Sequence, residues 1–349
     1  MAYDEHSCHN PAPEGPGIEP YWTEGDKAAV GTAYSVASAV WYTLSRGILN
    51  EVYYPTIDRP QLRDLQYLVT DGQSFLHEER RDLESEVTAL APHSLGAQVV
   101  SRDPDGRYQI VKEIITDPDH PCLLMHTRVE GDPEFLKTVR LYVLCSPYLD
   151  ATGWGNHGRV VIAEGRKILM AHKEAAHLAL ATTQPFTRCS CGYVGVNDGW
   201  QDLSESFQMD WEYDCAHDGN IALLGELELS QGTEFTLGLA FGETTHRALT
   251  TLFQSSAIPF EQHRSRFESQ WEQACHALPA LEEASGDKSN LYHRSQHLLL
   301  GHEDKRYPGA MIASLSIPWG QAKTDREGTG GYHLVWTRDL VKRSMGLLA

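Results

Sequence analysis

The stretch Phe235-Thr236-Leu237-Gly238-Leu239-Ala240-Phe241 decides the fold, because its large apolar side chains occupy every second position. Successive side chains of a β-strand point to opposite faces, so a period of two places one face of the strand against a core. The segment 139–145 shows the same alternation, with apolar residues at its odd-numbered positions. These two segments predict strands of a sheet that is buried on one side.

Turn signals between apolar segments extend this pattern over residues 28–257. Asp71-Gly72, Asp105-Gly106 and Glu164-Gly165 lie where a hairpin needs positive φ, which glycine adopts without strain. Residues 159–162 and 167–170, on either side of one such turn, predict a hairpin. Many short strands without intervening helical patterns favour a mainly β fold, with two antiparallel sheets packed as a large β-sandwich.

The periodicity changes near residue 258. Phe260, Phe267, Trp271 and Ala274 recur at helical spacing and predict the apolar face of a helix. A second helix is expected from about 287 to 300 and a third from about 337 to the end. The sequence thus divides into a β-sandwich domain over 1–257, a helical linker over 258–286 and a further helical region over 287–349.

Composition restricts the class of partner. Lys and Arg total 29 and Asp and Glu total 48, which gives a net charge of −19. Such a chain repels phosphate backbones and anionic lipid, so we expect neither a nucleic acid nor a membrane as partner. We find no apolar run of the roughly 20 residues that span a bilayer, and residues 1–20 do not resemble a signal peptide. Seven scattered cysteines favour reduced thiols and a cytoplasmic location.

The stretch 330–339 is the strongest candidate for a binding site. Its two adjacent glycines allow a loop to approach a ligand closely. Tyr332 and Trp336 offer flat apolar faces, while Arg338 and Asp339 supply donors beside acceptors, which suits a polyhydroxylated ligand. The residues alone leave a second interpretation open, namely an aromatic core stripe followed by an Arg–Asp ion pair at a helix N-terminus.

Tyr332-x-x-x-Trp336-Thr337-Arg338-Asp339 resembles the first active-site segment of glycoside hydrolase family 15, the glucoamylases and glucodextranases. The Trp-Thr-Arg-Asp tetrapeptide is that of fungal members, whereas bacterial and archaeal members usually carry Pro in place of Thr337. Residues 309–320, 40–47 and 51–58 are similar to the prokaryotic branch and follow the family's order. The chain is therefore identified as a member of this family.

The resemblance implies a large N-terminal β-sandwich, a helical linker and an (α/α)6 barrel that holds the active site. In the family, the Arg and Asp of the motif hold the terminal glucose, and its Tyr and Trp line the same subsite. By position these residues are Arg338, Asp339, Tyr332 and Trp336, and Trp319 in the preceding loop is a further candidate. The implied substrate is an α-glucan or maltooligosaccharide, from which glucose is released at non-reducing ends without a cofactor.

The catalytic pair of the family is expected outside this sequence. Inverting members use two glutamates about 6.5–9.5 Å apart, which lie on later barrel helices, and no acidic residue follows Asp339 here. Twelve helices with their loops need on the order of 200 residues, so 287–349 provides only the first helices of an incomplete barrel. We therefore assign no catalytic residue to this chain and expect it to be inactive alone.

An incomplete barrel leaves apolar helix faces without neighbours. We expect the Phe267/Trp271 face and the Leu291/Leu298 face to be short of partners. The missing barrel segment or self-association would then cover them.

Two other functions remain open. The sandwich could act only as a carbohydrate-binding or assembly module, or it could belong to a disaccharide phosphorylase, since those enzymes share the sandwich-and-barrel plan. Trp154 and Trp200 are weaker candidates for sugar contacts. Cys189 and Cys191 are interpreted as free thiols at a sheet turn, the acidic stretch 202–218 as a solvated sheet edge, and the seventeen histidines as surface residues.

Overall fold

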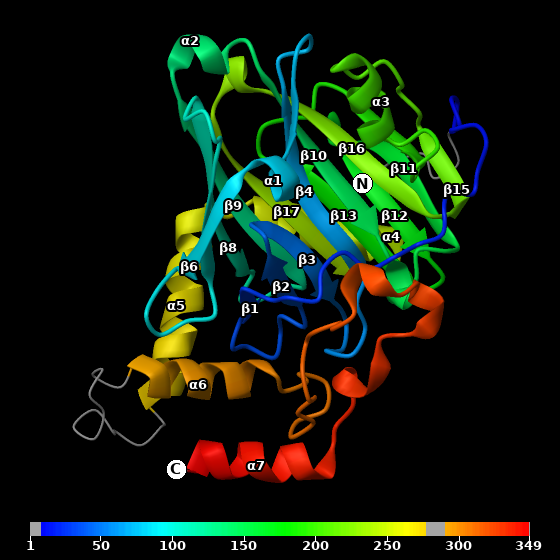
Figure 1. The fold of residues 1–349 in the computed structure, drawn as a ribbon. Coiled ribbons are helices and arrows are strands. Elements are labelled where there is room, and N and C mark those ends of the chain that lie inside the picture. Colours follow the sequence, from blue (N-terminus) through cyan, green and yellow to red (C-terminus); the bar gives the residue numbers. More distant parts are fainter. Residues whose placement is uncertain (1–7, 277–289, 349) are drawn as a thin grey trace.

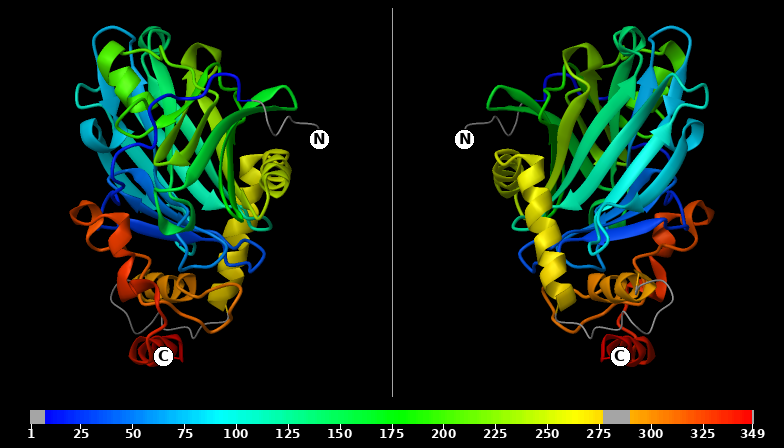
Figure 2. Two further views of the ribbon diagram at one scale, coloured as in Figure 1. Left: turned by 90° about the vertical axis from the view of Figure 1, so that its right-hand side faces the viewer. Right: turned by 90° about the vertical axis from the view of Figure 1, so that its left-hand side faces the viewer.

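The computed structural model describes residues 8–276 and 290–348. Its strands form two large antiparallel sheets that face each other, and helices lie outside them (Figure 1). Figure 2 shows the sandwich from two sides, with the C-terminal helices beneath it. The predicted mainly β fold, a two-sheet antiparallel sandwich followed by helices, is confirmed.

The first sheet has eight strands in the order β1-β2-β3-β4-β10-β16-β14, and β5 pairs with β4. The order shows that strands distant in the sequence meet at the centre of the sheet. The bounds of its strands are β1 Ala29–Thr32, β2 Trp41–Ser45, β3 Ile48–Tyr53, β4 Leu62–Thr70, β5 Leu76–Glu78, β10 Arg140–Pro147, β14 Cys189–Tyr193 and β16 Ile221–Glu228.

The second sheet has nine strands in the order β15-β11-β12-β13-β17-β9-β8-β7-β6. The predicted hairpin is the pair β11–β12, in which Ile162 lies opposite Lys167. Glu164 and Gly165 between them have φ of 51° and 73°, as a tight hairpin turn requires. The bounds are β6 Glu84–Ala89, β7 Ala97–Arg102, β8 Tyr108–Thr116, β9 Cys122–Gly131, β11 Asn156–Ala163, β12 Arg166–Lys173, β13 Ala176–Thr182, β15 Cys215–Gly219 and β17 Glu234–Gly242.

The main core lies between the two sheets. Leu141 and Val143 of β10 and Leu237 and Leu239 of β17 are fully buried there, as their alternation predicted. Each buried side chain of this size contributes roughly 1.5–3 kcal/mol of transfer free energy.

An ion pair also lies in this core. Lys112 of β8 contacts Glu79, the first residue of helix α1 (Glu79–Asp82), and both side chains are buried. Lys112 Nζ also donates to the backbone oxygen of Gly47 at 2.5 Å, and Ser101 donates to Glu79 at 2.8 Å. These partners satisfy both buried charges, which would otherwise be costly to desolvate.

Helices α4 (Thr245–Ser256) and α5 (Phe260–His276) cover the outer face of the nine-stranded sheet (Figure 2). Two expectations were wrong here. We assigned residues 245–256 to the β-rich body, but they form a helix that packs on β17 and β13. Phe267 and Trp271 do share one helical face, yet they are buried against the sheet rather than short of partners.

The outer face of the eight-stranded sheet carries helix α3 (Gly199–Ser206), and the short helix α2 (Pro133–Leu136) follows β9 of the other sheet. The acidic stretch is therefore not a solvated sheet edge at this point. Asp202 of α3 is buried and accepts hydrogen bonds from the backbone N–H groups of Asp210 and Trp211, both at 2.8 Å. Its carboxylate has a structural role, because it orders the chain after α3.

The expectation that all seven cysteines are reduced thiols is wrong for two of them. Cys8 and Cys215 form a disulfide, and Pro11 pairs with Cys215 in a β-bridge. The N-terminal segment thus runs along β15, a proximity that the large sequence separation concealed. Cys189 and Cys191 are free and buried as thiols, but they lie within strand β14 rather than at a turn.

Helices α6 (Asn290–Gly301) and α7 (Thr337–Leu348) form a layer beneath the sandwich (Figure 1). The predicted boundary between linker and barrel, at residues 286 and 287, lies outside the described residues, so that division stays a prediction. In the part of the chain that the structure describes, no helix combines the length and apolar character needed to cross a bilayer.

Candidate functional site

Residues 302–336 connect α6 to α7 and lie against one end of the sandwich (Figure 1). Asp304 accepts a hydrogen bond from the backbone N–H of Ile57 at 2.8 Å, in the connection between β3 and β4. Lys305 donates to three oxygens at the end of β1 and in the loop after it, at 2.5–2.7 Å. These contacts hold the segment that carries the candidate motif against the first sheet.

Two indole rings enclose the paired glycines of this motif. A Cβ on Gly330 would lie 2.2 Å from Trp319, and a Cβ on Gly331 would lie 3.0 Å from Trp336. Gly330 also has a φ of 72°. Glycine is required at 330 for both reasons, and the rings that the loop approaches are those of the protein itself.

Tyr332 and Trp336 are half-exposed, at 45% and 50% of their surface. The backbone between them is fixed, because the carbonyl of Tyr332 accepts from the N–H of Ser314 at 2.9 Å and that of Leu334 accepts from Ala313 at 3.1 Å. Trp336 donates from Nε1 to the carbonyl of Gly331 at 2.6 Å. The Trp336 ring is therefore held in place, and part of each ring faces solvent, which differs from a core stripe.

Arg338 and Asp339 lie in the first turn of α7. The Arg338 side chain is 81% exposed, that of Asp339 is 31% exposed, and Nη2 lies 3.8 Å from Oδ1. An exposed pair at this distance contributes little to stability, so both groups are available to a ligand. The structure brings Trp319, Tyr332 and Trp336 into one loop cluster, with Arg338 and Asp339 directly after it.

His333, between the two motif aromatics, is a buried support that the sequence interpretation missed. Its Nε2 lies 3.3 Å from the hydroxyl of Tyr53, which donates to the carbonyl of Leu315 at 2.6 Å. Burial lowers the pKa of His333 to about 4, so the imidazole is neutral near pH 7. The interpretation of all histidines as surface residues is wrong for His333 and also for His263 and His297.

Hydrogen bonds hold the part of helix α7 that follows the motif. Arg343 donates to the backbone carbonyls of Ile312 and Ala313, and Gln296 of α6 donates to the carbonyl of Gly346 at 2.7 Å. The apolar faces of these two helices are nevertheless open. The exposed side chains are Leu291, Leu298, Val341 and Met345.

A cavity of about 470 Å³, lined by both polar and apolar side chains, lies on the outer face of the eight-stranded sheet. Its floor consists of Asp64 and Gln66 from β4, Leu144 and Ser146 from β10, and Ala222 from β16. The N-terminal segment 18–23, the chain around the start of α3, and the loop after Trp319 form its walls. None of our sequence arguments located this cavity.

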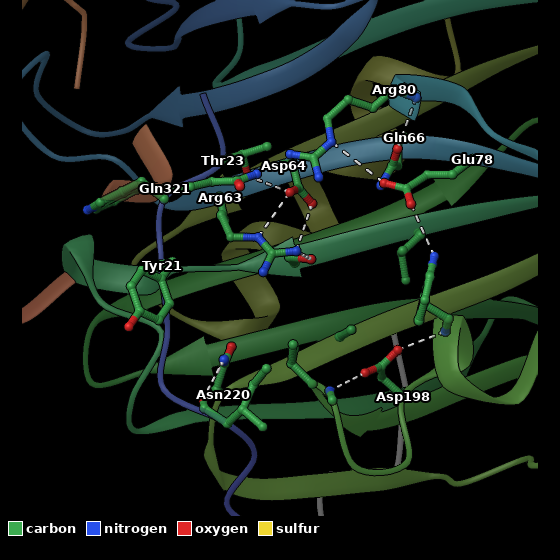
Figure 3. Close-up of a pocket in the computed structure, with 18 of the residues that line it drawn as sticks. Tyr21, Thr23, Arg63, Asp64, Gln66, Glu78, Arg80, Asp198, Asn220 and Gln321 are labelled. Atoms are coloured by element: carbon green, nitrogen blue, oxygen red, sulfur yellow. Dashed lines mark hydrogen bonds and ion pairs between the residues drawn. The ribbon is translucent and has the colours of Figure 1, made fainter. Parts of the chain in front are cut away.

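Several polar side chains of the cavity are paired with one another (Figure 3). Arg63 donates to Asp64 at 2.9 Å, Gln66 donates to Glu78 at 3.0 Å, and the indole of Trp200 donates to Glu78 at 3.1 Å. Burial acts to raise the pKa of Asp64, but Arg63 and a hydrogen bond from Thr23 outweigh it, so the pKa lies below its usual value.

Asn220 lies on the opposite side of the cavity (Figure 3). Its Nδ2 donates to the carbonyl of Ile18 at 2.9 Å, whereas its Oδ1 is buried and has no hydrogen-bond partner among the described residues. A smaller cavity shares Thr23, Arg80 and Gln321 with this one and extends to Trp319. Donors and acceptors beside an indole suit a ligand with many hydroxyl groups.

A family model described as glucodextranase, domain N, matches residues 12–275. A glucoamylase from Clostridium sp. (strain G0005) is 38% identical over 329 residues, which are 94% of this chain and 46% of that relative. The chain belongs to glycoside hydrolase family 15. The resemblance of the segments 40–47, 51–58, 309–320 and 332–339 thus pointed to the correct family.

Solved structures agree with this assignment. A crystal structure of a bacterial glucoamylase complexed with acarbose superposes on the family 15 chain with a TM-score of 0.90 at 37% identity, covering 96% of this chain and 49% of that chain. A family 92 glycosyl hydrolase superposes with a TM-score of 0.50 at 11% identity, over 82% of this chain and 39% of that chain, which shows a shared fold alone. The chain spans about half the length of the relatives it matches.

Proposed function

We propose that this family 15 chain is the N-terminal part of an inverting, exo-acting α-glucan hydrolase that releases glucose from non-reducing ends. The observation that carries the proposal is the superposition, at a TM-score of 0.90, on a bacterial glucoamylase whose crystal contains acarbose. The 38% identity to a second glucoamylase extends over nearly the whole chain. Family membership alone would leave the substrate open.

In this proposal Arg338 and Asp339 hold the terminal glucose, and Tyr332, Trp336 and Trp319 line its subsite. The exposed guanidinium presents a planar fork of donors, and the carboxylate beside it accepts from hydroxyl groups. The half-exposed rings of Tyr332 and Trp336 offer apolar faces to the sugar ring.

The hydrolytic step belongs to two glutamates on later barrel helices, outside this chain. An inverting pair needs one carboxylic acid to protonate the leaving oxygen and one carboxylate to activate water. The 349 residues alone are therefore expected to be inactive, and the reaction needs no cofactor. The further barrel helices cover the exposed faces of α6 and α7.

The coding sequence after codon 349 tests this proposal. It is expected to continue in frame into a helical region with two glutamates, and the resulting enzyme should release glucose from maltooligosaccharides. In that enzyme Arg338→Lys should lower kcat/KM by on the order of 10–100-fold, since a hydrogen bond to a charged group contributes about 1.5–3 kcal/mol. Lys342→Arg, an exposed change on the same helix, is the matched control. An unchanged kcat/KM in Arg338→Lys contradicts the assigned role.

The cavity on the eight-stranded sheet supports a second candidate, a carbohydrate-binding module. It combines Trp200, which we had considered for sugar contacts, with the unpaired Oδ1 of Asn220. Calorimetric titration of the chain with maltooligosaccharides separates the two functions. Loss of binding in Trp200→Ala but not in Trp336→Ala favours the module, and the reverse result favours the hydrolase subsite.

A further inference from the structure

Three potential metal ligands lie close together where the C-terminal end of α5 meets α6, beneath the sandwich. Cys275 lies near the end of α5, His297 lies on α6, and His93 lies in the loop between β6 and β7. Their ligand atoms all lie within 4.8 Å of one another, and Cys275 Sγ is 2.6 Å from His297 Nε2. On one tetrahedral zinc ion, ligand atoms lie roughly 3.3–3.6 Å apart, given Zn–S of about 2.3 Å and Zn–N of about 2.0–2.1 Å. The three ligand atoms are therefore clustered on the scale of a zinc site.

A fourth group lies beside these three. His293 precedes His297 by one helical turn on α6, and its ring centroid is 5.1 Å from that of His93. Two histidines four residues apart on one helix face are a common arrangement for binding one zinc ion. The Nδ1 of His293 is buried and has no hydrogen-bond partner within 8–276 and 290–348. A buried nitrogen without a partner among the described residues is a candidate for coordinating a metal ion.

His297 is buried, and Cys275 beside it is half-buried. The ring of Trp271 packs edge-on against His297 at 5.3 Å and fixes one side of the cluster. A bound cation stabilises the thiolate form of Cys275.

We propose that Cys275, His297 and His93, with His293 as the fourth ligand, bind a structural Zn²⁺ ion. Thiolate and imidazole ligands together select zinc among the common divalent cations. On binding, the Cys275 thiol releases its proton to solvent and the three imidazoles coordinate in their neutral form. The ion joins the β6–β7 loop of the sandwich, the linker helix and α6, and thereby fixes the first barrel helix to the sandwich.

The other thiols of the chain do not compete for this ion. Cys8 and Cys215 lie near His217, but their sulfurs form a disulfide and cannot coordinate as thiolates. Cys122, Cys145, Cys189 and Cys191 are buried in the sandwich. Cys275 is thus the accessible free thiol among the described residues.

Cobalt titration of the whole chain tests the proposal. The chain is stripped with a chelator under conditions that keep the disulfide, and then titrated with CoCl₂. We expect a thiolate-to-cobalt charge-transfer band that saturates at one ion per chain and disappears when one equivalent of ZnCl₂ is added. Amide exchange over 290–301 should slow in the zinc-loaded chain, because the ion fixes α6.

Variants assign the ligands. Cys275→Ser should abolish the charge-transfer band, and His297→Gln should weaken cobalt binding by at least about 10–100-fold, the loss typical of changes around a metal site. His93 is exposed on a loop, so we expect His93→Gln to keep the fold and to weaken cobalt binding. This variant tests the site even if the other two variants fail to fold. His246→Gln, at an exposed position on α4, is the control. Equal cobalt binding in all of these variants shows an adventitious ion only and overturns the proposal, as does a cobalt spectrum without a thiolate band.

Discussion

Nζ of Lys305 lies 4.9 Å from the centroid of the Trp41 ring. This contact joins the segment after α6 to β2 of the sandwich, and the lysine also donates to Thr32, Ala33 and Ser38. Lys305 is therefore one of several polar side chains that join the segment after α6 to the sandwich, together with Asp304 and Tyr53. Apolar contacts such as that of Ile312 and Leu315 with Trp41 accompany it.

Replacing Lys305 tests how much its contacts stabilise the segment that leads to the candidate site. Lys305→Met leaves three oxygens without their donor, and each buried unsatisfied group costs about 1–3 kcal/mol. We expect faster amide exchange over 302–316 with little change in the strands of the sandwich. Lys342→Met, at an exposed position of α7, is the control and should leave this exchange unaltered. Uniform exchange changes across both sheets would contradict a local role.

The buried pair of Lys112 and Glu79 gives a prediction for the sandwich itself. Glu79→Gln removes the charge that compensates the lysine, and breaking a buried pair in this way costs about 3–5 kcal/mol. Urea unfolding followed by circular dichroism measures the loss. Glu84→Gln, at an exposed position of β6, should change the midpoint little. The double variant Glu79→Leu/Lys112→Met should recover much of the stability, because no unpaired charge is left in it.

Gly330 and Gly328 have nearly the same φ but different surroundings, so alanine variants at the two positions test the contact with Trp319. Gly330 and Gly328 have φ of 72° and 71°, but a Cβ would meet Trp319 only at 330, since nothing lies within 4 Å of one at 328. Alanine is strained at both positions. We expect Gly330→Ala to destabilise the chain by about 1–3 kcal/mol more than Gly328→Ala, which is the usual cost of overpacking. Near-ultraviolet circular dichroism should report the displaced indole, and equal midpoints in the two variants would argue against the contact.

A row of histidines makes the sandwich sensitive to acid. His172 of β12 lies directly opposite His157 of β11 and His177 of β13, with ring centroids 4.9 and 5.5 Å apart. Burial, followed by the neighbouring His157, lowers the pKa of His172 to about 4. Its unfolded pKa is about 6.5, so the unfolded chain binds more protons, and stability falls as the pH decreases from about 6.5 to about 4.

The pH dependence of the unfolding midpoint checks this sign. His172→Gln should flatten the decrease between those two pH values, and only partly, because His297 and His333 have lowered pKa values in the same range. His246→Gln should leave the slope as it is in the parent chain. A steeper decrease in His172→Gln would show that the row stabilises the folded state when protonated.

The alternation of apolar residues predicted the sandwich because it reports which side of each strand is buried. It failed at 245–256, where threonines typical of strands obscure the helical spacing of Ala248, Leu249 and Leu252. It also could not show that Phe267 and Trp271 pack on a sheet, since a helical face indicates burial without naming the partner. The family motif located Tyr332–Asp339, but the contacts of Gly330 with Trp319 required the folded backbone.

The cavity and the metal cluster had no comparable signal in the sequence. Asp64, Glu78, Asp198 and Asn220 come from four separate segments, and only strand order brings them together. The spacing of His293 and His297 was visible as a pair on one helix face. The other two members of the cluster, His93 and Cys275, are far from this pair in the sequence. The pair alone therefore did not distinguish a metal site from two surface histidines.

The N-terminal segment is held by residues of the same chain that are synthesised much later. Ile18 donates to the carbonyl of Val194, its own carbonyl accepts from Asn220, and the carbonyl of Pro20 accepts from Asp325. During translation these first residues must stay unattached while more than half of the chain emerges, and the outer wall of the cavity is completed last. A nascent chain arrested before residue 190 should therefore be cut readily by protease between residues 9 and 23, and a chain released from the ribosome should resist the same treatment.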